Sequence, residues 1–165
     1  QVAIGLYTEV LKLQKDNFDA LLRIGLLMYE DRHFHDAVNH LQKAFYLKPD
    51  NPQLLLALGV SLIELNKLEL AVSSLSRLVG KYPEDAEAHL QLGVLLQGLG
   101  WVEAAITQLE KAYELNSQSG EAAFNLAVSY LALQEPDIDK ARTYYKKAIS
   151  LGMGKDPVLE KYFAE

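Results

Sequence analysis

The sequence of 165 residues contains no cysteine. This absence excludes disulfides, thiolate metal sites and a cysteine nucleophile, but it leaves the compartment open because cytosolic and secreted proteins can both lack cysteine. Long apolar runs are also missing. The longest candidate, 54–60, has only seven residues and is followed closely by the polar residues Ser61, Glu64 and Asn66. A membrane-spanning helix needs roughly 20 apolar residues. We therefore expect no membrane span, and the sequence does not indicate a localisation.

The sequence also lacks the clustered lysine and arginine residues that holding a phosphate backbone would require. The chain has 16 basic and 22 acidic residues, for a net charge of -6. A nucleic-acid partner requires clustered positive charge to neutralise its phosphates. We therefore expect no nucleic-acid partner. Half of the residues are apolar, at 50%, which provides enough material for a packed core.

The sequence also lacks a recognisable catalytic motif. Ser61 and Ser129 lie inside expected helices, and no nucleophile-elbow pattern surrounds them. The segment 152–155 follows a helix and lacks the full spacing of a phosphate-binding loop, so we interpret it as a turn. We predict no catalytic residue and no bound cofactor.

One group of side chains has metal-ligand chemistry. It contains His33, His35, Asp36 and His40, of which Asp36 and His40 share a helix face four residues apart. His35 and His40 are expected on an outer wall and His33 in a turn. We therefore predict a solvated surface here and no metal site.

What the sequence does contain is a repeat of 34 residues. Small residues recur at this interval in one series, at Gly25, Gly59, Gly93 and Ala127. A second series has Ala3, Ala37, Ala71 and Ala105, and resumes at Ala141 after two extra residues within 134–137. A third contains Ala44, Leu78, Ala112 and Ala148, and two prolines show the same interval, Pro49 and Pro83. Small residues are expected where two antiparallel helices cross closely, because larger side chains would separate the backbones.

This pattern resembles the tetratricopeptide repeat family, in which the first helix carries a small residue, the second carries alanine twice and proline follows. The resemblance implies an all-α fold, a right-handed superhelical solenoid of antiparallel helix hairpins. The periodicity predicts helices near residues 1–14, 18–31, 34–47, 52–65, 68–81, 86–99, 102–115, 120–133, 138–150 and 157–164. The last of these should begin with Asp156 as N-cap and Pro157 at the first helical position.

We predict a single repeat domain over residues 1–165. Its parts are the second helix of a partial repeat at 1–15, repeats at 18–51, 52–85 and 86–119, a repeat with a two-residue insertion at 120–155, and a final segment at 156–165. The final segment is either a capping helix or the start of a further repeat. Because the chain opens at Gln1 in the second half of a repeat and without Met, we expect an excised fragment or a processed product.

The first helices are apolar nearly all round, as in 21–29 and 54–60, so they must be covered on several sides. In the family these helices form the inner wall, which implies an apolar groove whose residues we call the inner strip: Leu22, Leu26, Tyr29, Leu56, Val60, Ile63, Leu90, Val94, Gln97, Phe124, Val128 and Leu131. Polar and acidic residues are expected at its edge: Asp19, Glu30, Gln53, Glu64, Glu87 and Glu121.

We therefore predict an interaction scaffold or adaptor and not an enzyme. Its partner would be another protein or peptide, an apolar segment or amphipathic helix with basic flanks. Leu22, Leu26, Leu56 and Val60 cannot bind a carboxylate, which disfavours the chaperone C-termini that some family members clamp.

Other readings of the sequence stay open. The repeats are also compatible with a targeting or regulatory arm of a larger enzyme, or with a carrier that holds a hydrophobic client. A neighbouring copy could also cover the strip by self-association. Trp101, in a turn, either packs across that turn or marks a second contact site.

Overall fold

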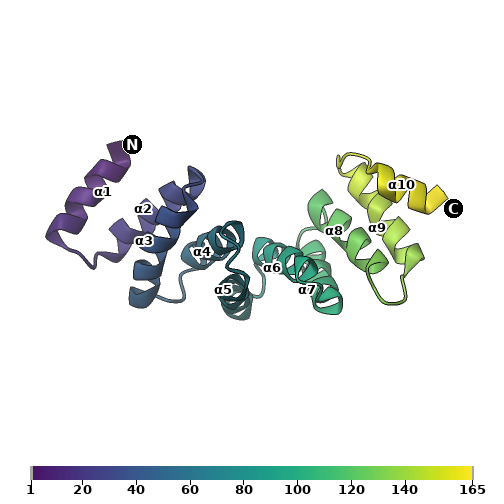
Figure 1. Cartoon of the computed structure of the whole chain (residues 1–165), viewed down its shortest axis with the longest axis horizontal. Helices are drawn as coiled ribbons and strands as arrows, with labels where there is room; N and C mark the ends of the chain where they lie inside the picture. The colour runs from purple at the N-terminus through teal and green to yellow at the C-terminus, as the bar shows by residue number, and fades with distance from the viewer. Residues whose placement is uncertain (1, 165) are drawn as a thin grey trace. The chain divides into compact units, whose positions relative to one another are not determined.

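The computed structural model describes residues 2–164, and this range contains ten helices and no strand (Figure 1). The chain divides into two compact units, Gln1–Pro83 and Glu84–Glu165, and each is described by itself. The first unit contains α1 (Val2–Leu13), α2 (Phe18–Glu30), α3 (Phe34–Leu47), α4 (Pro52–Glu64) and α5 (Leu68–Lys81). The second contains α6 (Ala86–Gly98), α7 (Val102–Leu115), α8 (Gly120–Leu131), α9 (Ile138–Ser150) and α10 (Pro157–Ala164). The predicted all-α class is confirmed.

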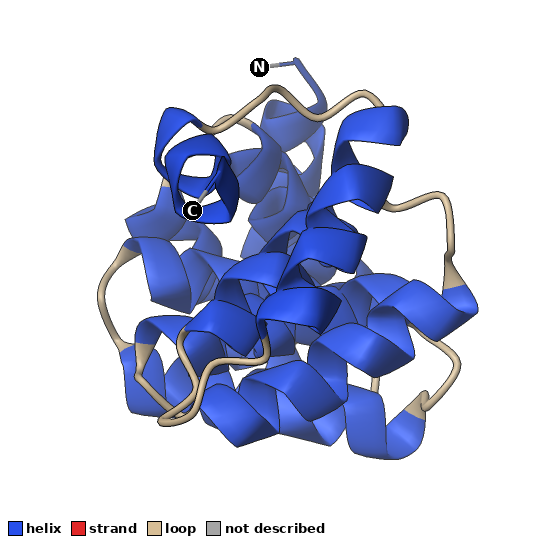
Figure 2. Cartoon of the chain, turned by 90° about the vertical axis from the view of Figure 1, so that its right-hand side faces the viewer, coloured by secondary structure: helices blue, strands red, loops and turns tan. Residues whose placement is uncertain are grey.

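Consecutive helices pack as hairpins. In the first unit α2 packs on α3, α4 on α5, and α3 also contacts α4. In the second unit α6 packs on α7, α8 on α9, and α7 contacts α8. The first helices of neighbouring hairpins also touch, α2 with α4 and α6 with α8. Figure 2 shows the short loops that join the helices.

The small residues lie where the two helices of a hairpin cross. A Cβ added to Gly25 would be 2.7 Å from the side chain of Leu41 in α3, and one added to Gly59 would be 2.7 Å from Leu75 in α5. In the second unit, a Cβ on Gly93 would be 2.6 Å from Leu109 in α7. These distances are shorter than carbon–carbon contact, so the crossings leave no room for a side chain.

The residues that cap the two ends of the first helices recur at the same interval of 34 residues. Each begins with a polar side chain that accepts a hydrogen bond from a backbone N–H three residues later: Asn17, Asn51, Asp85 and Ser119. This bond satisfies one of the free N–H groups of the first turn. Three first helices are followed by a residue of positive φ, Arg32 (60°), Asn66 (55°) and Gly100 (77°). The residue after each donates its N–H to the carbonyl five positions earlier, which closes the helix end.

The insertion changes the last of these turns. Ala132 ends α8, and α9 starts only after Asp137, whose side chain accepts from the N–H of Lys140 at 3.0 Å. Asp137 thus supplies a cap that the equivalent residues His33, Lys67 and Trp101 do not. The hairpin of α8 and α9 is otherwise preserved.

Helix α10 is attached to the end of the second unit. Asp156 accepts hydrogen bonds from the N–H groups of Val158 and Leu159 at 2.8 and 3.0 Å, so the predicted N-cap is confirmed. Leu159 is buried in a cluster with Ala127 and Tyr145, and Phe163 lies with its ring centroid 5.5 Å from that of Tyr145. The helix therefore covers part of the last hairpin.

The crossing of α4 and α5 can be tested by one added methyl group. We expect Gly59→Ala to lower the free energy of unfolding by about 1–3 kcal/mol, because Leu75 must move. Gly80→Ala is the matched control, since Gly80 lies inside α5 and an added Cβ would meet nothing within 4 Å. We expect it to raise the free energy of unfolding by up to about 1 kcal/mol through helix propensity. Urea unfolding followed by circular dichroism measures both variants, and equal stabilisation by the two would contradict the close crossing.

Candidate functional site

Six residues of the inner strip lie on α2 and α4 in the first unit. Their spacing of three and four residues places Leu22, Leu26 and Tyr29 on one face of α2, and Leu56, Val60 and Ile63 on the corresponding face of α4. Leu22 is buried, with 6% of its surface exposed, and the other five side chains are half-buried. The strip in this unit therefore presents part of each side chain to solvent rather than whole side chains.

The other six residues lie on α6 and α8 in the second unit. Leu90 is buried, with 6% exposed, and Val94, Gln97, Phe124, Val128 and Leu131 are half-buried. Phe124, Val128 and Leu131 also pack against the cluster of Ala127, Tyr145 and Leu159. This half of the strip is therefore partly used by the core of its own unit.

A cavity of about 270 Å³ opens beside the strip in the first unit. Its lining includes two strip residues, Tyr29 and Val60, and the two acidic residues that follow on the same helices, Glu30 and Glu64. Its other walls are Arg32 and Phe34. The cavity thus places the apolar surface of Tyr29 and Val60 beside two carboxylates and one guanidinium.

The charges around this cavity are only partly compensated. Arg32 lies 3.5 Å from Glu64 and 5.3 Å above the ring of Phe34. Glu30 has no ion-pair partner among residues 2–164. Because the Arg32–Glu64 pair is well exposed to solvent, it contributes little stability and can exchange partners. The carboxylate of Glu30 is thus unpaired, and that of Glu64 can exchange Arg32 for another cation.

Gln97 differs from the other strip residues because its amide is already engaged. Its Nε2 donates to the carbonyl of Asn125 at 3.1 Å and to Oγ of Ser129 at 2.8 Å. These bonds tie α6 to α8. Ser61 lies two repeat intervals, 68 residues, before Ser129 and is also fully buried, but its Oγ has no hydrogen-bond partner in the described chain.

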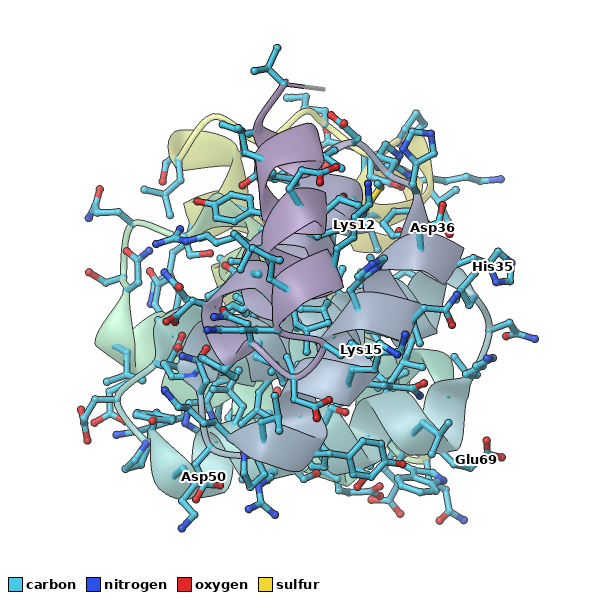
Figure 3. The ribbon with its side chains drawn as sticks, turned by 90° about the vertical axis from the view of Figure 1, so that its left-hand side faces the viewer. Lys12, Lys15, His35, Asp36, Asp50 and Glu69 are labelled. Atoms are coloured by element: carbon cyan, nitrogen blue, oxygen red, sulfur yellow. The ribbon has the colours of Figure 1, made fainter. Side chains whose placement is uncertain are left out.

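The other residues singled out in the sequence lie elsewhere. Figure 3 shows His35 and Asp36 on the outside of α3, and the ring Nδ1 of His40 is 2.9 Å from the carbonyl of Asp36. Within residues 2–164, no three His, Asp or Glu residues are grouped so that they could hold a metal ion. Trp101 is 55% exposed at the start of α7.

Among the helices of residues 2–164, none is long and apolar enough to cross a membrane.

A row of exposed apolar side chains lies outside the strip, on α1. Val2, Leu6, Val10 and Leu13 follow one face of this helix and are 82%, 66%, 37% and 88% exposed. Their spacing of four, four and three residues is visible in the sequence, but spacing alone does not show whether the face is buried or exposed. This helix has no buried residue.

Shifted pKa values also occur away from the strip. Burial and the nearby Glu110 carboxylate, which accepts a hydrogen bond from the Tyr130 hydroxyl, raise the pKa of Tyr130 above its usual range. The hydrogen bond from Arg77 lowers the pKa of Asp50, at a Nε–Oδ1 distance of 2.8 Å. Tyr130 links α8 to α7, and Asp50 links the turn after α3 to α5, so these shifts indicate structural contacts rather than acid–base chemistry at the strip.

This arrangement defines an all-α protein of repeated helical hairpins. Two sequence profiles of the tetratricopeptide repeat match residues 28–95 and 90–156. The chain belongs to the tetratricopeptide repeat family, whose members act as scaffolds for protein–protein interaction. No curated protein sequence matches the chain.

Solved structures of this family are similar over most of the chain. The crystal structure of MamA has 24% identity and a TM-score of 0.84, and the match covers 90% of this chain and 85% of MamA. MamA 41-end from Desulfovibrio magneticus RS-1 has 22% identity and a TM-score of 0.81, covering 90% and 82%. YrrB, described as a tetratricopeptide repeat protein with an unusual peptide-binding site, has 25% identity and a TM-score of 0.83, covering 96% and 80%.

The two buried serines should respond in opposite directions to loss of the hydroxyl. Ser129→Ala removes a hydrogen bond from Gln97, so we expect the free energy of unfolding to fall by about 1 kcal/mol. Ser61→Ala removes a buried hydroxyl without a partner, so we expect a rise of about 1 kcal/mol. Thermal or urea unfolding compares the two, and equal changes of the same sign would contradict these different environments.

Proposed function

We propose that the inner strip binds an apolar peptide or an amphipathic helix of another protein, with basic residues flanking its apolar anchors. The observation that carries this proposal is the cavity of about 270 Å³ in the first unit, where Tyr29 and Val60 lie beside Glu30 and Glu64. Apolar surface next to the unpaired carboxylate of Glu30 and the exposed, Arg32-paired carboxylate of Glu64 matches a ligand of apolar and cationic character. Membership in a family of interaction scaffolds, and the peptide-binding site named for YrrB, agree with it.

The half-burial of the strip limits the expected affinity. Fully burying a Leu-sized side chain contributes about 1.5–3 kcal/mol. Association itself costs on the order of 4–15 kcal/mol. Because the strip residues are already partly covered, only a few anchors add substantial area. The proposal therefore predicts micromolar rather than nanomolar binding for an untethered peptide.

Peptides selected from a random phage-display library on the intact chain provide a ligand for testing the strip. We expect the double variant Leu56→Lys and Val60→Lys to weaken binding at least about tenfold, because two cations replace apolar contacts. The matched control is Val2→Lys with Leu6→Lys on α1, which adds the same charge at exposed apolar positions and should leave binding unchanged. Fluorescence anisotropy of the labelled peptide measures both.

A second variant keeps this test decisive if the lysines unfold the chain. Ile63→Gln introduces the residue found at the equivalent position of α6, Gln97, so the repeat accommodates it. It should weaken the selected peptide severalfold while the circular dichroism melt stays cooperative. Unchanged affinity in this folded variant, or loss of affinity only in the α1 control, would show that the ligand binds elsewhere.

The acidic neighbours of the strip should set the charge preference. We expect Glu30→Gln together with Glu64→Gln to weaken a peptide with Lys or Arg flanks severalfold, and to reduce the salt dependence of its binding. A peptide in which the flanks are replaced by Gln should bind both proteins equally. Asp36→Asn with Glu69→Gln is the control, because these carboxylates lie on the second helices of the same unit. An equal effect of the control pair would indicate net charge rather than local contact.

A further inference from the structure

A second cavity, of about 530 Å³, lies at the end of the second unit, between α9 and α10. We call it the basic pocket. Helix α9 contributes Arg142, Tyr145, Lys146 and Ile149. The turn after it contributes Lys155, and α10 contributes Glu160 and Phe163. None of these residues belongs to the inner strip.

Arg142 occupies a position that is aliphatic in the preceding hairpins. It follows Ala141 as Val38 follows Ala37, Val72 follows Ala71 and Ile106 follows Ala105. Val38 and Ile106 are buried, with 3% and 9% exposed, so this position normally packs in the core. A guanidinium here is therefore not required by the repeat, and it adds charge where the other hairpins have none.

The hydrogen-bonding capacity of Arg142 is largely unused. Its Nη2 donates to the carbonyl of Phe163 at a long 3.4 Å, and its Nε is buried without a hydrogen-bond partner in the described chain. A buried donor without a partner is unfavourable. The Nε and Nη groups of arginine form a planar fork that fits a carboxylate through two parallel hydrogen bonds. A carboxylate in the cavity would satisfy this fork once the long bond to Phe163 is released.

The charge of the pocket favours an anion. Lys155 lies 3.3 Å from Glu160, so these two side chains compensate each other. Lys146 is exposed, lies one helical turn after Arg142, and has no ion-pair partner within residues 2–164. Of the seven Lys and Arg residues after Pro83, five lie between Lys140 and Lys155, although this half of the chain is acidic as a whole. Arg142 and Lys146 thus leave the cavity with uncompensated positive charge.

We infer that the basic pocket binds the side-chain carboxylate of an Asp or Glu residue in a partner polypeptide, with an adjacent apolar side chain against Ile149 and Phe163. The guanidinium of Arg142 and the ammonium of Lys146 hold the carboxylate. The aromatic and aliphatic walls select a segment in which an apolar residue stands next to an acidic one. This ligand is opposite in charge to the one proposed for the inner strip, so the two surfaces take different segments.

A pair of short blocked peptides tests this inference on the whole chain. We would titrate the ¹⁵N-labelled protein with acetyl-Leu-Glu-Glu-Phe-amide and with its neutral counterpart acetyl-Leu-Gln-Gln-Phe-amide. The Nε–H signal of Arg142 and the backbone amides of α9 and α10 report binding by NMR. We expect saturable shifts with the Glu peptide, and at least about tenfold weaker binding of the Gln peptide.

Two substitutions and a control assign the effect to the pocket. Arg142→Val restores the residue type of the preceding hairpins and should fold, and Lys146→Gln removes the second charge. Each should weaken the Glu peptide at least about fivefold. Lys161→Gln removes one exposed charge of α10 that does not line the cavity, and should leave binding unchanged.

Four outcomes would overturn the inference. One is equal binding of the Glu and Gln peptides. Another is unchanged affinity in folded Arg142→Val. A third is that sodium acetate at the same carboxylate concentration produces the same saturable shifts, because the site would then hold a small anion and not a peptide. A fourth is that the shifts are confined to α2 and α4, because the acidic peptide would then bind outside the basic pocket.

Discussion

The close crossing of the two helices within each hairpin is the constraint on which the rest of the structure depends. Gly25, Gly59 and Gly93 meet leucines of the following helix at distances that exclude a further carbon atom. This contact buries one face of each first helix against its hairpin partner. The first helix of the neighbouring hairpin covers a second face, as α4 does for α2 and α8 does for α6. The inner strip is what remains of an almost wholly apolar helix after these two faces are used. Its partial exposure therefore follows from the same packing that stabilises the hairpins.

Most of the fold could be predicted because the repeat interval is a property of the sequence itself. The observed helices end within two residues of the predicted ones, and the small residues lie at the expected crossings. The caps were mostly missed, because Asn17, Asp85 and Ser119 differ in residue type while forming the same hydrogen bond. The exposure of the strip could not be derived, since it depends on how far each neighbouring helix covers Leu22 or Leu90. For the same reason, the bonds of Gln97 to α8 were not foreseen.

The two candidate surfaces differ in chemistry and in what creates them. The inner strip arises from regular repeat positions, and the cation preference proposed for it rests on its acidic neighbours Glu30 and Glu64. The basic pocket arises from departures from the repeat, above all an arginine where three hairpins have valine or isoleucine. A repeat scaffold with both surfaces would bind partner segments of opposite charge at different places along its own chain. Departures from the internal pattern are therefore as informative about function as the pattern itself.

The central claim is that the inner strip, and not the more exposed apolar face of α1, recognises the partner. The most direct measurement is the set of intermolecular nuclear Overhauser effects between a bound phage-selected peptide and the methyl groups of the intact chain. We expect contacts from the peptide to the methyl groups of Val60 and Ile63. Contacts confined to Val2, Leu6, Val10 and Leu13, with none to α2 or α4, would contradict it.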